Sequence, residues 1–300
     1  MSTVGGVLVN LIVVLAVAPL FDGVMRKLKA LIHSRQGPPI TQSYTDVLKL
    51  LGKEDIQSGG GVIFRLAPIM VLGAMLVAAL FTPLGGKPPL GVAGDTIVWI
   101  YVISLAAVAI MLGAFASGNP YAYEGASREM MMLLTVEPIV IAALLTAAVK
   151  AGTLSMGGIM AWQVTHGATM SMAFAAIAFF LALQANLGKL PFDIVEAESE
   201  IMEGPIIEYS GPRLAMYKMA FYVRQLIFPL VLVSVFIPWP IVNLYPLAVL
   251  ITLAKVLVVL LIVGLIECVN PRLRIDQSMT YMSRVLFVAL AGLVFAAMGV

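Results

Sequence analysis

The feature that most constrains the fold of this chain is a series of long apolar runs with few charges. Eight such runs lie near residues 4–21, 66–82, 96–117, 129–149, 169–188, 222–238, 241–266 and 280–299. Because a helix rises about 1.5 Å per residue, roughly 17–25 apolar residues cross about 30 Å of hydrocarbon. The sequence therefore predicts an all-α, polytopic membrane protein with eight transmembrane helices.

Composition excludes the main alternative classes. The chain is 61% hydrophobic and 11% charged, whereas soluble domains are about 45–50% apolar and about 25% charged. Cys268 is the only cysteine, so neither a disulfide framework nor a Cys-ligated zinc or iron–sulfur centre fits within this chain. A net charge of +2 gives no reason to expect a nucleic-acid partner.

Catalytic patterns are also missing from the sequence. No phosphate-binding glycine loop and no Ser–His–Asp arrangement is apparent, and the predicted topology places His33 and His166 on opposite sides of the membrane. We therefore expect no catalytic residue, no metal and no cofactor bound by this chain itself.

The distribution of Lys and Arg predicts the orientation. With the N-terminus outside, the inner segments 22–65, 118–128, 189–224 and 267–284 hold 15 of the 18 bases, and only Lys87 and Lys150 lie outside. This asymmetry obeys the positive-inside rule. We expect a multi-pass protein of the cell (cytoplasmic) membrane with both termini outside. Residues 1–300 form a single membrane domain, and inner loops 22–65 and 189–221 form its docking face.

An acidic segment, residues 189–208, carries six acids against one base. Pro191 suits the first turn of a helix and Gly204-Pro205 would end it, so we expect Asp193, Glu196, Glu200 and Glu203 on one helical face. Like charges so spaced need compensation. The plainer alternative is a solvated cytoplasmic loop. The full set of acids is Asp193, Glu196, Glu198, Glu200, Glu203 and Glu208.

A basic segment, residues 23–65, carries seven bases against three acids. A short amphipathic helix is expected around Ser43–Leu51, with apolar positions that suit the membrane surface. Either this is an ordinary positive-inside loop, or the basic and acidic segments pack together and form a polar dock for a cytoplasmic partner.

Two ionisable residues fall at membrane depth, Glu137 and Lys255. Such groups usually face a protein interior or a water-filled path. We interpret them as part of a proton relay, the alternative being a structural buried pair or hydrogen bond. Acids near the inner ends of spans either extend the path or are merely interfacial; they are Asp22, Glu124, Glu129 and Glu267.

Three motifs resemble a known family. They are Arg35-Gln36-Gly37-Pro38-Pro39 with Gln42, Asp46 and Lys49-Leu50; Gly125-Ala126-Ser127-Arg128-Glu129; and Gly188-Lys189-Leu190-Pro191-Phe192-Asp193 through the acids to Glu208-Tyr209-Ser210-Gly211. Together they are similar to the membrane anchor shared by subunit 1 of respiratory complex I and energy-converting NiFe hydrogenases, and Asn186-Leu187-Gly188-Lys189 is closer to the formate-hydrogenlyase type.

The resemblance implies a role within a larger complex. It implies hydrophilic NiFe and iron–sulfur partner subunits that carry a NiFe centre and 4Fe-4S clusters, and antiporter-like membrane neighbours. It assigns Glu137 to an intramembrane acid and the acidic segment to the surface beneath the iron–sulfur subunit. The residues expected to contact the partner subunits are Arg35, Gln42, Asp46, Lys49, Arg128 and Lys189. Asn186 stands where many relatives have a glutamate.

The functional hypothesis is a non-catalytic, ion-coupling subunit of a redox-driven proton- or sodium-pumping hydrogenase complex. Alternatives are a quinone-site subunit of a complex I-type dehydrogenase, a sulfane reductase subunit, or, from a different class, an autonomous secondary transporter. The last would favour paired interrupted helices in two related halves, and the sequence shows no such symmetry.

Overall fold

The computed structural model describes residues 3–56, 61–86, 88–91, 94–242 and 244–299. Within these ranges the chain is helical and contains no strand, which confirms the predicted all-α class. The long helices are α1 (Thr3–Ile32), α3 (Val62–Phe81), α4 (Asp95–Ser117), α5 (Pro120–Ala151), α7 (Met170–Asn186), α9 (Gly211–Phe236), α10 (Tyr245–Val269) and α11 (Ile275–Ala297). Seven are long and apolar enough to cross a membrane, and α7, with 17 residues, is a shorter eighth.

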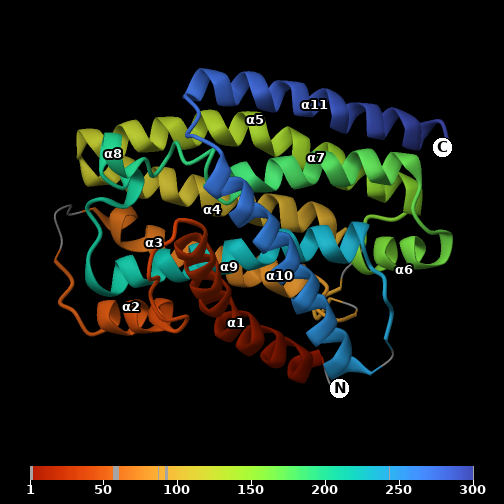
Figure 1. Ribbon diagram of the computed structural model, residues 1–300, viewed down its shortest axis with the longest axis horizontal. Coiled ribbons are helices and arrows are strands. Elements are labelled where there is room, and N and C mark those ends of the chain that lie inside the picture. The colour runs from red at the N-terminus through yellow and green to blue at the C-terminus, as the bar shows by residue number, and fades with distance from the viewer. Residues whose placement is uncertain (1–2, 57–60, 87, 92–93, 243, 300) are drawn as a thin grey trace.

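Helix α9 forms the centre of the bundle. In its most apolar stretch 83% of the residues are buried, compared with 28% in α10 and in α11. Figure 1 shows α11 lying along α5 and α7 at one side, while α1 and α10 cross the other side. The peripheral helices therefore present apolar surface to lipid, and α9 packs against protein on all sides.

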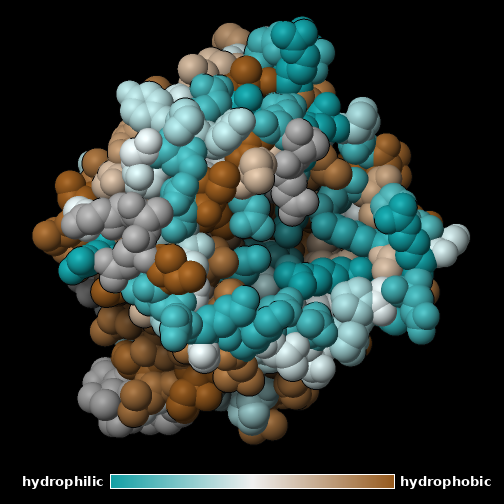
Figure 2. All heavy atoms as spheres, turned by 90° about the vertical axis from the view of Figure 1, so that its left-hand side faces the viewer, coloured by the Kyte–Doolittle hydropathy of each residue, from teal (hydrophilic) through white to brown (hydrophobic). Residues whose placement is uncertain are grey.

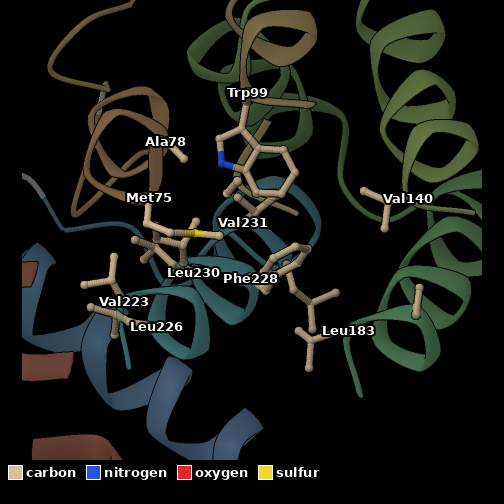
Figure 3. Close-up of a cluster of buried hydrophobic side chains, with 14 of the residues drawn as sticks. Met75, Ala78, Trp99, Val140, Leu183, Val223, Leu226, Phe228, Leu230 and Val231 are labelled. Carbon is tan, nitrogen blue, oxygen red and sulfur yellow. The ribbon is translucent and has the colours of Figure 1, made fainter. Parts of the chain in front are cut away.

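The apolar core is built around large side chains from several helices. Trp99 of α4 is fully buried and meets Phe228 of α9 edge-on, with ring centroids 5.4 Å apart. Figure 3 shows Met75 from α3 and Leu183 from α7 converging on the same cluster. Because interiors pack at crystal-like density, this cluster fixes the relative positions of the helices that carry the polar groups.

The short elements gather mainly at one end, the left-hand side of Figure 1. They are α2 (Gln42–Leu51), α8 (Glu198–Ile201) and the 3-10 helix η1 (Gly204–Ile206); α6 (Met156–His166) lies at the opposite end. We call the first of these the polar end. Seen end-on in Figure 2, its hydrophilic side chains surround a hollow.

Helix α2 confirms the amphipathic helix expected around Ser43–Leu51. Ser43 and Val47 are buried against the protein, while Leu48 and Leu51 are exposed. This exposed apolar edge suits the surface of a membrane.

The expected helix through the acidic segment is wrong. Only Glu198–Ile201 is helical, and Met202 and Glu203 adopt left-handed backbone conformations with φ of 50° and 72°. The reason is burial: Phe192, Ile194 and Ala197 all point inward, at 3%, 3% and 0% exposure. Residues separated by two and then three positions do not lie on one face of a helix. An irregular backbone lets all three side chains point inward and keeps the like-charged carboxylates apart.

One helix boundary also differs from the expectation. The run expected from Ile241 begins its helix at Tyr245, after a non-helical connection. Lys87 lies outside the described residues, as does the side chain of Glu198.

Candidate functional site at the polar end

Two motif glycines seat the acidic segment on α5. A Cβ atom added to Gly125 would lie 2.6 Å from Pro205 Cδ and 2.9 Å from Gly204 Cα, closer than real atoms approach. Gly204 has a φ of +52°, a left-handed conformation that side chains rarely adopt. The absence of a side chain at Gly125 therefore allows Gly204 and Pro205, which belong to a different motif, to contact α5.

Tyr209 fastens the end of the acidic segment to α3. Pro68 has no N–H, so the carbonyl of Phe64 four residues earlier loses its helical partner. The Tyr209 hydroxyl donates to that carbonyl at 3.1 Å, and the two rings stack with centroids 4.1 Å apart. Burial raises the pKa of Tyr209 to about 12, so the hydroxyl remains a donor at physiological pH.

The charges that compensate the acidic segment come from arginines elsewhere. Arg128 of α5 donates to Glu200 at 2.7 Å, and Arg272 donates to Asp193 at 2.6 Å. The bond from Arg128 lowers the pKa of Glu200. In the described part of the chain, no base of the basic segment forms an ion pair with these acids. The compensation of Asp193 and Glu200 therefore comes from outside the basic segment.

The basic segment instead folds back on itself and on α9. Arg26 binds Asp22 at 2.8 Å and Asp46 at 3.2 Å, and also donates to the Tyr222 hydroxyl. Gln42 donates to Asp46 at 2.9 Å. These bonds hold α2 on α1 and α9, so Gln42 and Asp46 position a helix within this chain.

The basic segment also contacts residues that follow the acidic segment. Ile56 and Ser210 exchange hydrogen bonds of 3.0 and 2.9 Å, and Arg213 forms an ion pair with Asp55 at 3.0 Å. Contact is thus present, but the acid comes from the basic segment and the base from α9.

A first cavity, of about 50 Å³, lies beneath the acidic segment. Its polar lining includes Glu129, Asn186, Asp193, Glu196 and Arg224. Arg224 lies 3.9 Å from Glu129 and attracts Glu196 as well. Burial raises the pKa of Glu196, while Arg224 and Lys189 oppose that rise. Two carboxylates that line one cavity beside a guanidinium can take up and release a proton.

A second cavity, of about 250 Å³, adjoins the first. Both are lined by Gly188, Glu196, Ile206, Phe221 and Arg224. The bases lining the second are Arg26, Lys29, Lys189, Lys218 and Arg224, and its acids are Asp22, Glu196 and Glu203. Lys29 also forms an ion pair with Glu267 of α10. Asp22 and Glu267, expected near inner span ends, thus reach one polar network.

The structure does not join Glu137 to Lys255. Glu137 accepts a hydrogen bond from Ser104 of α4. The Lys255 ammonium donates to the carbonyls of Ile237 and Pro238, at 3.1 and 3.0 Å. The Lys255 ammonium therefore supplies hydrogen bonds to carbonyls just after the end of α9, and it lies far along α10 from the acids of the polar end. Glu137 lies on α5, the same helix as Glu129.

The remaining predicted residues lie at the surface of the polar end. Glu124 pairs with Arg128 at 3.2 Å, and Asn119 donates to Glu208. Arg35 and Lys49 are exposed. Among the described residues, no group of three or more His, Cys, Asp or Glu side chains is placed to hold a metal.

Sequence reasoning missed the basic members of the site. Arg224 and Arg272 were counted only as positive-inside charges and Lys29 only as a member of the basic segment, yet each contacts or faces an acid of the site. A signal existed for Arg224, because it stands among the apolar residues that begin a span, where an unpaired base is costly.

The chain is similar in sequence to subunits of known complexes. The sequence matches the NADH dehydrogenase family over residues 5–297. It is 35% identical to formate hydrogenlyase subunit 4 of Escherichia coli over 280 residues, covering 90% of this chain and 91% of that one. It is 31% identical to an NADH-quinone oxidoreductase subunit of Anoxybacillus flavithermus, covering 87% and 82%.

A solved structure is also similar over the whole chain. A chain of an archaeal respiratory membrane complex, the membrane-bound sulfane sulfur reductase, matches with a TM-score of 0.91 and 32% identity. The match covers 99% of this chain and 100% of that one.

Proposed function

The chain belongs to the NADH dehydrogenase family, and from this premise we propose that it is the membrane-anchoring, ion-coupling subunit of a redox-driven complex of hydrogenase type. Its relatives are subunits of multisubunit membrane complexes, and formate hydrogenlyase subunit 4 and hydrogenase-4 component C, at 35% and 34% identity, favour the hydrogenase branch. The electron chemistry then belongs to partner subunits, which would carry the NiFe centre and 4Fe-4S clusters.

The observation that carries this proposal is that Glu129, Glu196 and Arg224 line one cavity, with Arg224 3.9 Å from Glu129. Glu196 comes from the acidic segment at the surface and Glu129 from α5, and both line the first cavity. Glu137 lies eight residues further along α5, about 12 Å at 1.5 Å per residue. A proton held at Glu196 would pass to Glu129 and continue along α5 toward Glu137.

Glu129 also compensates for the lack of a carboxyl group at Asn186. Both side chains line the first cavity, and an amide hydrogen-bonds but does not take up a proton. In this proposal Glu129 supplies the titratable carboxyl at this depth.

The polar end is the proposed dock for the hydrophilic NiFe and iron–sulfur subunits. Acidic residues there are held by arginines of α5 and of the segment before α11, so the surface is preformed. The bias of bases toward this end supports a cytoplasmic polar end with both termini outside. Antiporter-like subunits would contact the lipid-facing helices.

The relay is tested in proteoliposomes that contain the whole complex. We expect Glu129→Gln and Glu137→Gln to lower ion movement more than hydrogen evolution, because the electron path lies in other subunits. Asp276→Asn is the control, since this exposed acid lies outside the proposed path. Equal loss of both activities in the two variants, or no loss in either, would contradict the relay.

The dock is tested by co-purification. Reversing charge at Glu200 and Glu203 together should detach the hydrophilic subunits. Because Glu200 also binds Arg128 within this chain, Glu200→Gln separates loss of that internal bond from loss of the dock. Full retention of the iron–sulfur subunit by the double reversal would refute the assignment.

A further inference from the structure

The second cavity at the polar end carries more positive than negative charge. Five bases and three acids line it. Three of the bases, Arg26, Lys29 and Arg224, already have carboxylate partners in Asp22, Glu267 and Glu129, which leaves Lys189 and Lys218. Among the described residues, no carboxylate lies within 4.0 Å of the ammonium group of Lys189 or Lys218. Unpaired bases in a partly enclosed space favour an anion.

A buried amide supports the same conclusion. Gln225 lines this cavity with a side chain that is 4% exposed, and its Nε2 has no hydrogen-bond partner among the described residues. A buried N–H group left unsatisfied costs about 1–3 kcal/mol, so such groups normally have a ligand, a protein partner or water. The unpaired donors of the cavity thus come from a lysine of α9, an amide of α9 and Lys189 of the acidic segment.

We propose that the second cavity binds a phosphate-bearing anion, either the headgroup of an anionic phospholipid or soluble phosphate. The cavity volume of about 250 Å³ leaves room for a phosphate group. Met25, Leu187 and Phe221 add apolar walls beside the bases, which suits a lipid at the membrane surface. Basic pockets between transmembrane helices on the cytoplasmic side bind such headgroups in other membrane proteins. The site borders the proposed proton relay, because Glu196 and Arg224 line both cavities, but the groups proposed to hold the anion are Lys189, Lys218 and Gln225.

The experiment compares two double variants of the purified complex. Lys189→Gln with Lys218→Gln removes the two unpaired bases of the cavity. Lys27→Gln with Lys53→Gln removes the same charge from nearby residues that do not line it. Each complex is placed in nanodiscs of phosphatidylcholine with or without phosphatidylglycerol, and bound lipid is counted by native mass spectrometry. Inorganic phosphate is titrated in a separate arm without phosphatidylglycerol.

We expect the unaltered complex and the control variant to retain phosphatidylglycerol, and the cavity variant to bind it roughly 30-fold more weakly. Phosphate binding that depends on the same two lysines, without retained phosphatidylglycerol, assigns the site to the soluble anion. The proposal is overturned if neither anion binds, if both double variants lose binding equally, or if carbodiimide cross-links Lys189 to a partner carboxylate that fills the cavity. Gln225→Leu gives an independent check, since it should weaken binding without removing charge.

Discussion

Tyr209 offers the sharpest test of how the acidic segment is held. In Tyr209→Phe the stacked ring remains, and only the hydroxyl that donates to the Phe64 carbonyl is lost. Pro68 leaves that carbonyl without its helical partner, so a buried acceptor becomes unsatisfied. This should cost about 1–3 kcal/mol. Equilibrium unfolding in mixed detergent micelles measures the loss, and hydrogen exchange should show weaker protection across residues 190–210.

The matched control restores the missing donor. In a Pro68→Ala background the new N–H can satisfy the Phe64 carbonyl within α3, so Tyr209→Phe should then cost less than about 1 kcal/mol. The double-mutant cycle would give a coupling energy on the order of 1–2 kcal/mol. If Tyr209→Phe costs the same in both backgrounds, the hydroxyl is not compensating for the proline and the reasoning fails.

Three further predictions concern other parts of the molecule. Burial raises the folded-state pKa of Glu196, so the stability of the unaltered chain falls as pH rises from the unfolded-state pKa through the folded-state pKa. The thermal midpoint of Glu196→Gln should therefore rise relative to that of the unaltered chain across this pH window. A difference in midpoint that stays constant with pH would argue against this reasoning. Lys255→Met should destabilise by about 1–3 kcal/mol because it frees the carbonyls of Ile237 and Pro238, whereas Lys255→Arg should retain most of the stability in the same unfolding assay. Gly125→Val should displace η1 and abolish recovery of the hydrophilic subunits in pull-downs, while an unchanged yield would show that the close approach is dispensable.

The all-α class could be predicted from the sequence because apolar runs long enough to cross a bilayer fold there mainly as helices. Helix α2 was readable for a similar local reason, since its apolar positions repeat at helical spacing. The motifs also marked the correct surfaces: Gly125 and Gly204-Pro205 were singled out separately, and they touch.

The conformation of the acidic segment was not readable, because local spacing competed with burial. The acids at intervals of three and four residues indicated a helix, but Phe192, Ile194 and Ala197 bury only if the backbone is irregular. Tertiary packing outweighs the weak helical preference of such a charged segment.

The sequence by itself determined which residues enter the membrane, because hydrophobic transfer depends on each run alone. Only the tertiary structure decided which charges meet. Arg224 reaches Glu129 from a different helix, and Lys255 reaches the end of α9 instead of Glu137. Electrostatic partners depend on distances between helices remote in the chain, and those distances are set by how the apolar core packs.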